Sequence, residues 1–433
     1  MIVVTKFGGS SVSSYERFKQ VKEIVLKDDN RKVVVSSAIG KIDSSDNKIT
    51  DLLYLLSAHV KYKVNYDQVF NTIKVRFYTI KKELNLKIDL EKEFAEIEKN
   101  INSEDYLVSR GEYLTSLMLS EYLGFKFIDA KDIIEFNYDG KVNYEKTYKL
   151  INEKYNKIDK IVVPGFYGSY PNGDIKLFSR GGSDITGSIL ARAINATRYE
   201  NFTDVDGFYC ASPKIVDNPR LISKITYDEL RELSYMGASV IHEETILPIQ
   251  DLNIPLYIKN TFNPDGIGTI ITKDETESNN IITGIAGKKD FLAINITKSK
   301  SQGKLEIIDY VLNVLKKYHV PIESIPTSID SFSIVVEENL VKRNIYDIVQ
   351  DLKENEDIID IKIDDGLALI AVVGRNMVYK PGISAKLFSL LGENKINIKL
   401  ISQNTSEISI IIGVQNKDFE KAIKAIYNGT VKE

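Results

Sequence analysis

The sequence is poor in the side chains that form disulfides and metal sites. Its 433 residues include one cysteine, Cys210, and three widely separated histidines, His59, His242 and His319. A single cysteine cannot form an internal disulfide, and no Cys/His spacing of a structural zinc site is present. A disulfide-stapled scaffold and a structural zinc domain are therefore excluded.

An excess of charge of one sign is also missing. Lysine and arginine number 57 and aspartate and glutamate 61, for a formal net charge of −4. Such a chain has no general basic field that would hold nucleic acid or anionic lipid, so any anion site must be local. We expect neither a nucleic-acid partner nor a membrane partner.

Long apolar runs are absent too. No run approaches the roughly 18 apolar residues of a membrane-spanning helix, and the apolar start at residues 2–4 is soon interrupted by Lys6, Gly8 and Gly9. We therefore expect no signal peptide and a cytoplasmic location. With 43% apolar and 27% charged residues, the composition is that of a globular protein of about three ordinary domains.

Residues 1–287 alternate short apolar strands with helices. Strands are expected at 2–7, 32–36, 160–163, 199–202 and 254–258, and helices at 14–29, 50–63, 111–123, 183–195 and 226–237. This alternation predicts an α/β fold with a mostly parallel sheet between two helical layers, and ligands at the carboxyl ends of the strands. Residues 64–105 are interpreted as a helical insertion that covers the surface, and residues 273–280 as a linker.

The C-terminal part contains an internal repeat. Residues 332–336 (FSIVV) fall on residues 408–412 (ISIII) without a gap, at an offset of 76 residues. Each copy has the pattern strand, helix, two strands, helix. We predict two small α+β domains of the βαββαβ type, at 288–362 and 363–433, whose sheets pack together because neither buries enough surface alone.

The first strand leads into Lys6-Phe7-Gly8-Gly9-Ser10-Ser11, followed by a helix. Two glycines let backbone N–H groups approach an anion, and the helix start and the lysine add positive charge. The pattern matches neither of the common nucleotide-binding glycine motifs, so it fits a phosphate cradle or an ordinary glycine turn.

A second glycine pair opens the helix expected at 183–195. Arg180 precedes Gly181 and Gly182, and Ser183 and Asp184 follow them. Arg180 can bind a carboxylate or phosphate through two parallel hydrogen bonds, and Asp184 can hold a lysine or orient a metal. The alternative is a capped helix with a surface arginine.

Two further segments carry polar groups. Residues 202–207 (FTDVDG) form a strand end and a turn that suit the base and ribose of a nucleotide, although Asp-Gly turns are common. Residues 108–116 place Glu112 in the first turn of the helix expected at 111–123, where a glutamate is usually a cap.

In this order, the four segments resemble those of aspartate kinases of the amino-acid kinase superfamily, over essentially the whole chain. That family has loops of the form K-F-G-G-(S/T)-S, R-G-G-S-D and T-D-V-x-G, and two C-terminal ACT domains, and residues 401–413 are similar to the signature of the second ACT domain. The resemblance implies phosphorylation of the side-chain carboxylate of L-aspartate to 4-phospho-L-aspartate, with ATP and Mg²⁺. This reaction is the first step toward lysine, threonine and methionine.

The resemblance also implies roles for individual residues. Lys6 and Asp184 would be catalytic, with Lys6 neutralising the transferred phosphoryl group. Arg180 would bind the α-carboxylate of aspartate and Glu112 its ammonium group. The residues implied to border aspartate are Ser36, Thr50, Glu112, Phe166, Arg180 and Ser183, and those implied to lie along the nucleotide are Lys6, Gly8, Gly9, Ser10, Thr203, Asp204, Tyr209 and Lys214.

The chain departs from the family pattern at several places. Ser239 stands where the family often has a lysine, Ser212 precedes Pro213 and Lys214 in place of an aspartate, and His242 is interpreted as a packed or capping side chain. Residues 298–307 lack the Met-Asn and Gly-Phe of lysine-responsive members. We therefore expect the ACT pair to have a weakened or altered amino-acid site.

Two other functions remain open. The chain could be a catalytically weak paralogue that senses an amino acid through its ACT pair, or a kinase for another small carboxylate. The retained Lys6, Glu112, Arg180 and Asp184 favour the kinase. Exposed sheet edges of the ACT pair favour a homodimer or higher homo-oligomer, and Cys210 is expected to be a structural thiol.

Overall fold

The computed structural model describes residues 1–155, 159–179, 181–238, 241, 243–273, 280–299, 304–378, 380–403 and 408–432. The chain forms two compact units. The first comprises Met1–Phe208, Leu221–Tyr227 and Val240–Thr276, and the second comprises Tyr209–Arg220, Asp228–Ser239 and Glu277–Glu433. Within the described ranges, no helix is both long enough and apolar enough to cross a membrane.

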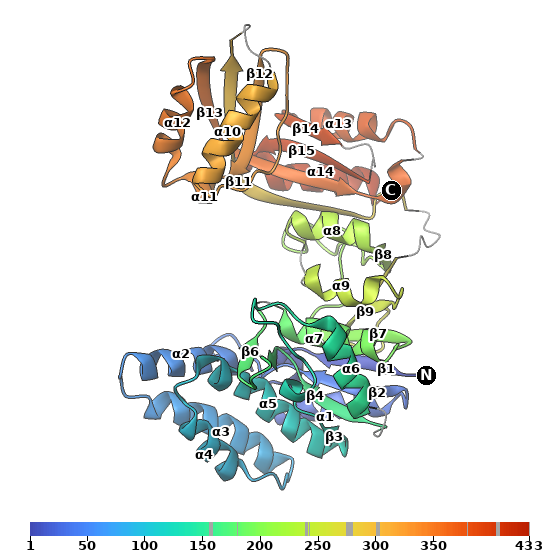
Figure 1. Cartoon of the computed structure of the whole chain (residues 1–433). Coiled ribbons are helices and arrows are strands. Elements are labelled where there is room, and N and C mark those ends of the chain that lie inside the picture. Colours follow the sequence, from blue (N-terminus) through green and yellow to red (C-terminus); the bar gives the residue numbers. More distant parts are fainter. Residues whose placement is uncertain are drawn as a thin grey trace. The chain divides into compact units, whose positions relative to one another are not determined.

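The first unit is built on an eight-stranded sheet in the order β3-β4-β2-β1-β7-β9-β10-β8 (Figure 1). Its strands are β1 (Val3–Phe7), β2 (Arg31–Ser36), β3 (Lys126–Phe127), β4 (Ile161–Pro164), β7 (Arg198–Thr203), β8 (Lys224–Thr226), β9 (Leu256–Asn260) and β10 (Thr269–Thr272). Every neighbouring pair is parallel except β9 and β10. The predicted mostly parallel sheet is confirmed.

Helices cover both faces of this sheet, so its central strands are buried on both sides. Helix α7 (Gly182–Ala193) packs on β1, β2 and β7, with α6 (Tyr144–Tyr155) and α9 (Leu247–Gln250) beside it. Helix α5 (Glu104–Leu123) packs on β2, β3 and β4, with α1 (Tyr15–Leu26) beside it. A small hairpin of β5 (Tyr167–Ser169) and β6 (Ile175–Leu177) lies next to α5.

The insertion is helical, as predicted. Helices α3 (Asp67–Glu83) and α4 (Leu90–Lys99) follow α2 (Ile49–Lys61). They pack through aromatic rings, with the centroid of Phe94 lying 5.8 Å from that of Phe70 and 6.1 Å from that of Phe77. Helix α3 also carries Arg76, whose contacts are described below.

The second unit contains a five-stranded sheet in the order β12-β11-β13-β15-β14. Its strands are β11 (Gly284–Lys298), β12 (Ser331–Glu337), β13 (Ile358–Val373), β14 (Leu400–Gln403) and β15 (Ser409–Gln415). Its helices are α8 (Tyr227–Tyr235), whose first residue belongs to the first unit, α10 (Lys304–Lys317), α11 (Glu338–Val341), α12 (Ile345–Lys353), α13 (Ile383–Glu393) and α14 (Phe419–Thr430). The predicted pair of α+β repeats is present.

The two repeats share strands. The start of β11 pairs with the end of β13, from Gly284 opposite Val373 to Lys288 opposite Leu369, and the end of β11 pairs with the start of β13. The register shifts between Lys288 and Phe291. The repeats thus form one continuous sheet, and the predicted domain boundaries at 287/288 and 362/363 fall inside β11 and β13.

Candidate active site

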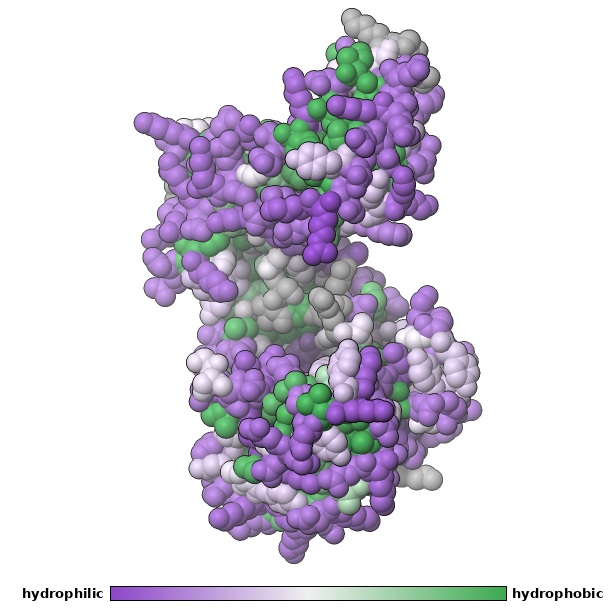
Figure 2. Space-filling model, turned by 90° about the vertical axis from the view of Figure 1, so that its left-hand side faces the viewer, coloured by the Kyte–Doolittle hydropathy of each residue, from purple (hydrophilic) through white to green (hydrophobic). Residues whose placement is uncertain are grey.

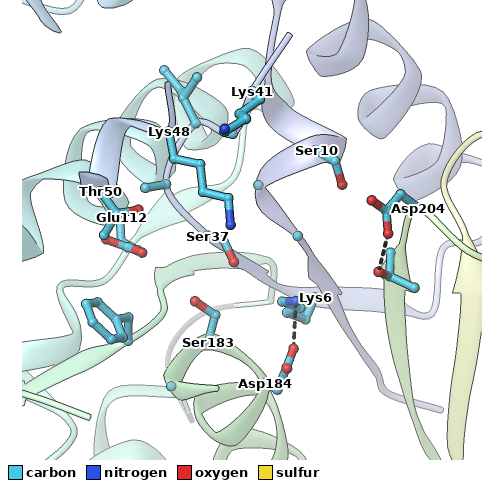
Figure 3. A pocket seen from close by; sticks show the side chains of 18 of the residues that line it. Lys6, Ser10, Ser37, Lys41, Lys48, Thr50, Glu112, Ser183, Asp184 and Asp204 are labelled. Atoms are coloured by element: carbon cyan, nitrogen blue, oxygen red, sulfur yellow. Dashed lines mark hydrogen bonds and ion pairs between the residues drawn. The ribbon is translucent and has the colours of Figure 1, made fainter. Parts of the chain in front are cut away.

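A cavity of about 550 Å³ lies in the first unit at the carboxyl ends of β1, β2 and β7 (Figure 3). It is bordered by the turn after β1, the loop after β2, one residue of α5, the residue Phe166 after β4, the first turn of α7, and the end of β7. Its lining residues are Lys6, Gly8, Gly9, Ser10, Ser37, Ala38, Ile39, Gly40, Lys41, Asp43, Lys48, Thr50, Glu112, Phe166, Gly181, Gly182, Ser183, Asp184, Thr203 and Asp204. The two glycine-bearing turns therefore meet at one site, as the sequence predicts.

Lys6 and Asp184 form the central ion pair of this cavity. The Lys6 ammonium lies 2.6 Å from Oδ1 of Asp184, and Asn201 Nδ2 donates to the same oxygen at 2.9 Å. Lys6 of β1 is in register with Asn201 of β7, so two adjacent strands present both groups to the first turn of α7. The prediction that Asp184 holds a lysine is confirmed.

The turn after β1 differs from the prediction in one respect. It does not open directly into a helix, because a 3-10 turn over Gly9–Val12 comes first and α1 begins only at Tyr15. The expected dipole of a helix start is therefore not located at Gly8 and Gly9. The turn is instead fixed by Gly8 N, which donates to Phe202 O at 3.0 Å.

The loop after β2 packs against this first turn, backbone to backbone. Gly40 N donates to Gly9 O at 2.9 Å. A Cβ atom at Gly40 would lie only 2.4 Å from the carbonyl carbon of Gly9, so a side chain there would force the two segments apart. This contact brings the loop after β2 to the edge of the cavity.

Phe166 has a strained backbone at the opposite side of the cavity. Its φ of 75° lies in the left-handed region, which is a real outlier for a bulky residue and is typical of functional sites. Its carbonyl accepts from Phe178 N at 2.9 Å, which ties it to the segment that leads into α7. Phe166 and Ser183 therefore line the same wall.

Glu112 lies in the middle of α5, so the prediction that it occupies a first turn is wrong. The helix begins at Glu104, where Ser103 accepts from Tyr106 N and two acidic residues occupy the first turn. Glu112 is 4% exposed, and burial raises the pKa of its carboxyl to about 8. Its Oε2 has no hydrogen-bond partner within the described part of the protein, so this oxygen can accept a bond from a cation in the cavity.

Three predicted residues do not line the cavity. Ser36 is fully buried and its hydroxyl donates to Ser37 O at 2.9 Å. Its neighbour Ser37, the first residue after β2, lines the cavity instead. Tyr209 and Lys214 belong to the second unit. Arg180 cannot be placed, since it lies outside the described residues.

Other predictions also fall outside the described ranges. They concern Ser239, His242, most of the expected linker and residues 300–303 of the segment expected to be altered in effector binding. Cys210 is described: it is buried, Arg220 Nε donates to its sulfur at 3.2 Å, and burial raises the pKa of its thiol. These features agree with a structural thiol.

Sequence reasoning missed the residues of the loop after β2, among them Ser37, Lys41, Asp43 and Lys48, and it missed Asn201. Asn201 is one of two adjacent polar residues in the middle of β7, Glu200 and Asn201, and only their burial in the fold marks them out. The two lysines flank a polar stretch that reads as an ordinary surface loop, and only the packing of that loop places them at the cavity.

The chain also resembles known proteins. A model of the amino acid kinase family matches residues 1–260, and a model of the ACT domain matches residues 370–429. Aspartokinase 3 of Bacillus subtilis (strain 168) is 34% identical, over 98% of this chain and 97% of that protein.

Solved structures resemble the chain over its whole length. The crystal structure of Clostridium acetobutylicum aspartate kinase, described as an allosteric enzyme, has 47% sequence identity and a TM-score of 0.95, and covers 99% of this chain and 100% of that one. E. coli aspartokinase III in complex with aspartate and ADP has a TM-score of 0.78 at 24% identity over 100% of both chains, and at this identity it shows the fold alone.

Proposed function

The chain belongs to the amino acid kinase family and is an aspartate kinase, and we propose that its cavity holds ATP and L-aspartate side by side for phosphoryl transfer. The product of this reaction is 4-phospho-L-aspartate, and the reaction belongs to amino-acid biosynthesis. We place it at the first step toward lysine, threonine and methionine, in the cytoplasm.

One observation carries the assignment of the site: the buried Lys6–Asp184 pair lies where two glycine-bearing turns meet. The attacking carboxylate of aspartate has an ordinary pKa near ~4, so it is already ionised and needs no general base. Catalysis then requires alignment of two anions and compensation of their charge in a site with little water. Lys6, oriented by Asp184, supplies positive charge at that point.

Glu112, Thr50, Phe166 and Ser183 form the proposed aspartate end of the cavity. The free Oε2 of Glu112 suits the substrate's ammonium group, and an acylated amine would leave this buried carboxyl without a partner. Ser37 takes the place that sequence reasoning gave to Ser36. We keep Arg180 as the proposed partner of the α-carboxylate.

Gly8, Gly9, Ser10, Thr203 and Asp204 form the proposed nucleotide end. Tyr209 and Lys214 remain proposed contacts of the nucleotide.

The donor set fits a Mg²⁺ that arrives with ATP. The described residues contain no cluster of three carboxylate, histidine or cysteine side chains, and Mg²⁺ needs only one or two carboxylates besides phosphate oxygens. Asp204, at the nucleotide end of the cavity, is the carboxylate we propose for it. Mg²⁺ would offset the negative charge of the phosphates.

We also propose that the second unit binds an amino-acid effector and mediates self-association. Several of its large apolar side chains are exposed: Leu305, Ile329, Tyr346, Ile359 and Ile401. Figure 2 shows hydrophobic groups at the surface of this unit, which is drawn at the top. Exposed apolar side chains together with an exposed sheet edge in the second unit favour a homodimer or higher homo-oligomer.

A substrate panel tests the activity. ADP release is measured with ATP, Mg²⁺ and, in turn, aspartate, glutamate, acetylglutamate and uridylate. We expect turnover with aspartate alone. Turnover with one of the other acceptors in place of aspartate would identify a different kinase, and no turnover with any of the four would support the sensor function.

A further inference from the structure

The loop after β2 brings two additional lysines to the cavity. Lys41 and Lys48 both line it, and neither side-chain ammonium group has a hydrogen bond or ion pair to any described residue. Figure 3 shows the Lys48 ammonium pointing into the cavity, between Glu112 and Lys6 in that view. Lys48 also directly precedes α2 and caps it, with Leu52 N donating to Lys48 O at 3.1 Å, so its backbone position is fixed.

The negative charge of the proposed reactants favours such a lysine. The described lining residues include three lysines and four acidic side chains, Asp43, Glu112, Asp184 and Asp204, of which the buried Glu112 keeps its proton up to a pKa of about 8 in the free protein. The charge of Lys6 is already shared with Asp184. A phosphate and a carboxylate that approach each other need more positive charge than this pair provides, and the positive end of the α2 dipole lies beside Lys48.

The loop after β2, which carries both lysines, is exposed to solvent. One carboxylate, that of Asp46, holds its backbone in place through hydrogen bonds. Asp46 Oδ2 accepts from Ile42 N at 2.9 Å, and its Oδ1 accepts from Asn47 N at 2.8 Å. The Asp46 carboxylate therefore closes the loop on itself just before Lys48.

Arg76 of the helical insertion forms hydrogen bonds that hold this loop in place. Its Nη1 donates to Oδ1 and Oδ2 of Asp46 at 2.9 and 2.8 Å, and its Nη2 donates to Gly40 O at 2.7 Å. The guanidinium thus joins the first and last parts of the loop. The Arg76 side chain is 14% exposed, so its charged hydrogen bonds are shielded from solvent and stronger than at an open surface.

We propose that Lys48 is a second phosphoryl-binding cation of the kinase, and that Arg76 and Asp46 are the residues that position it. This inference rests on the proposed function of the cavity. In the reaction, the Lys48 ammonium contacts the transferring phosphoryl group opposite Lys6 and balances charge that develops between the carboxylate and the leaving ADP. The insertion thereby acts as part of the active site.

The first test compares Lys48→Gln and Lys48→Arg with the wild-type chain in the ADP-release assay. We expect Lys48→Gln to lower kcat about 100-fold, with a much smaller change in KM for aspartate, and Lys48→Arg to recover a large part of the loss. Lys82→Gln removes an exposed charge from α3, the helix that carries Arg76, and is the control. A kcat of Lys48→Gln close to that of Lys82→Gln would overturn the proposal.

The second test asks whether Arg76 acts through Lys48. We expect Arg76→Gln to lower kcat at least tenfold in the wild-type background but less than about threefold in the Lys48→Gln background. Arg76→Lys keeps the charge without the fork, and we expect it to lie between Arg76→Gln and wild type. Equal losses in both backgrounds would show a purely structural role and contradict the positioning of Lys48.

Thermal unfolding of each variant separates a folding defect from a local one, and kinetics are compared among variants that unfold within a few degrees of wild type. The wild-type chain separates the two hypotheses. If it phosphorylates aspartate but Lys48→Gln does so equally well, this inference fails and the proposed function stands. If the wild-type chain releases no ADP with aspartate, the proposed function itself fails.

Discussion

Lys6 of β1 and Asp184 of α7 form an ion pair of 2.6 Å, although the strand and the helix are separated by most of the first unit's sequence. Asn201 of β7 donates to the same Asp184 oxygen. Asp184 thus has two donors and holds the lysine in one orientation, while the first turn of α7 adds its own positive potential. This arrangement is the basis of the proposed anion site.

Replacing Asp184 with asparagine tests this pair. Asp184→Asn leaves the Lys6 ammonium, 7% exposed as a residue, without its charged partner. We expect kcat to fall about 10- to 100-fold and the free energy of unfolding to fall by about 1–3 kcal/mol. Steady-state kinetics and urea unfolding measure the two effects. Asp265→Asn breaks the exposed Lys27–Asp265 pair and should change neither; equal effects of both variants would contradict the account.

Glu112 should govern the pH dependence of aspartate use. Burial raises its pKa to about 8, and only the ionised carboxylate attracts the ammonium group of the substrate. We expect kcat/KM for aspartate to rise with pH up to about that value, and Glu112→Gln to lower kcat/KM and to remove the inflection. A pH profile of both proteins measures this, and an unchanged inflection in Glu112→Gln would assign it to another group.

The same carboxyl should make the free protein less stable at higher pH. Between about pH 4.5, the ordinary value, and about pH 8, the folded protein retains a proton on Glu112 that the unfolded chain has released. The free energy of unfolding therefore falls as pH rises through this interval, by on the order of 3–5 kcal/mol from this group. Urea unfolding at both ends of the interval should show a smaller decrease for Glu112→Gln, and parallel decreases would disprove the assignment.

Gly40 should not tolerate a side chain. Gly40→Ala places a Cβ 2.4 Å from backbone of the first glycine turn, so the loop after β2 must move away from the cavity. We expect a loss of kcat of tenfold or more and destabilisation of about 1–3 kcal/mol. Gly392→Ala, inside α13 with nothing within 4 Å of the new Cβ, is the matched control and should be neutral or stabilising by up to about 1 kcal/mol. Full activity of Gly40→Ala would refute this packing argument.

Lysine should be a weak ligand of this enzyme. The segment at residues 298–307 lacks the Met-Asn and Gly-Phe of lysine-responsive aspartate kinases, so the amino-acid site of the ACT pair is expected to be weakened or altered. Isothermal titration calorimetry should show no tight binding, and millimolar lysine should inhibit little. Tight binding with matching inhibition would prove this expectation wrong.

The fold could be predicted where local pattern decides it. All five predicted strands of the first unit lie within two residues of the observed ones, because buried parallel strands are short apolar runs with clear ends. The strand sharing of β11 and β13 could not be predicted, since each strand carries two adjacent patterns that read as separate elements. Only the long-range pairing joins them.

The site was predictable where glycines and charges fall together in sequence. The start of α5 was misplaced because Gly111 is a poor helix residue; it is tolerated because a Cβ there would lie 2.9 Å from Ala38, so the helix needs a small residue at this contact. Lys48, Arg76 and Asp46 left no local signal. Their role depends on a tertiary contact between a loop and a separate helix.

Lys6→Ala is the decisive variant, with ADP release and aspartate binding measured on the same preparation. If the two glycine-bearing turns form one phosphoryl-transfer site around Lys6, kcat falls at least about 100-fold while calorimetry still detects aspartate. Turnover near that of the wild-type chain would mean that the reaction takes place without this lysine and would contradict the account.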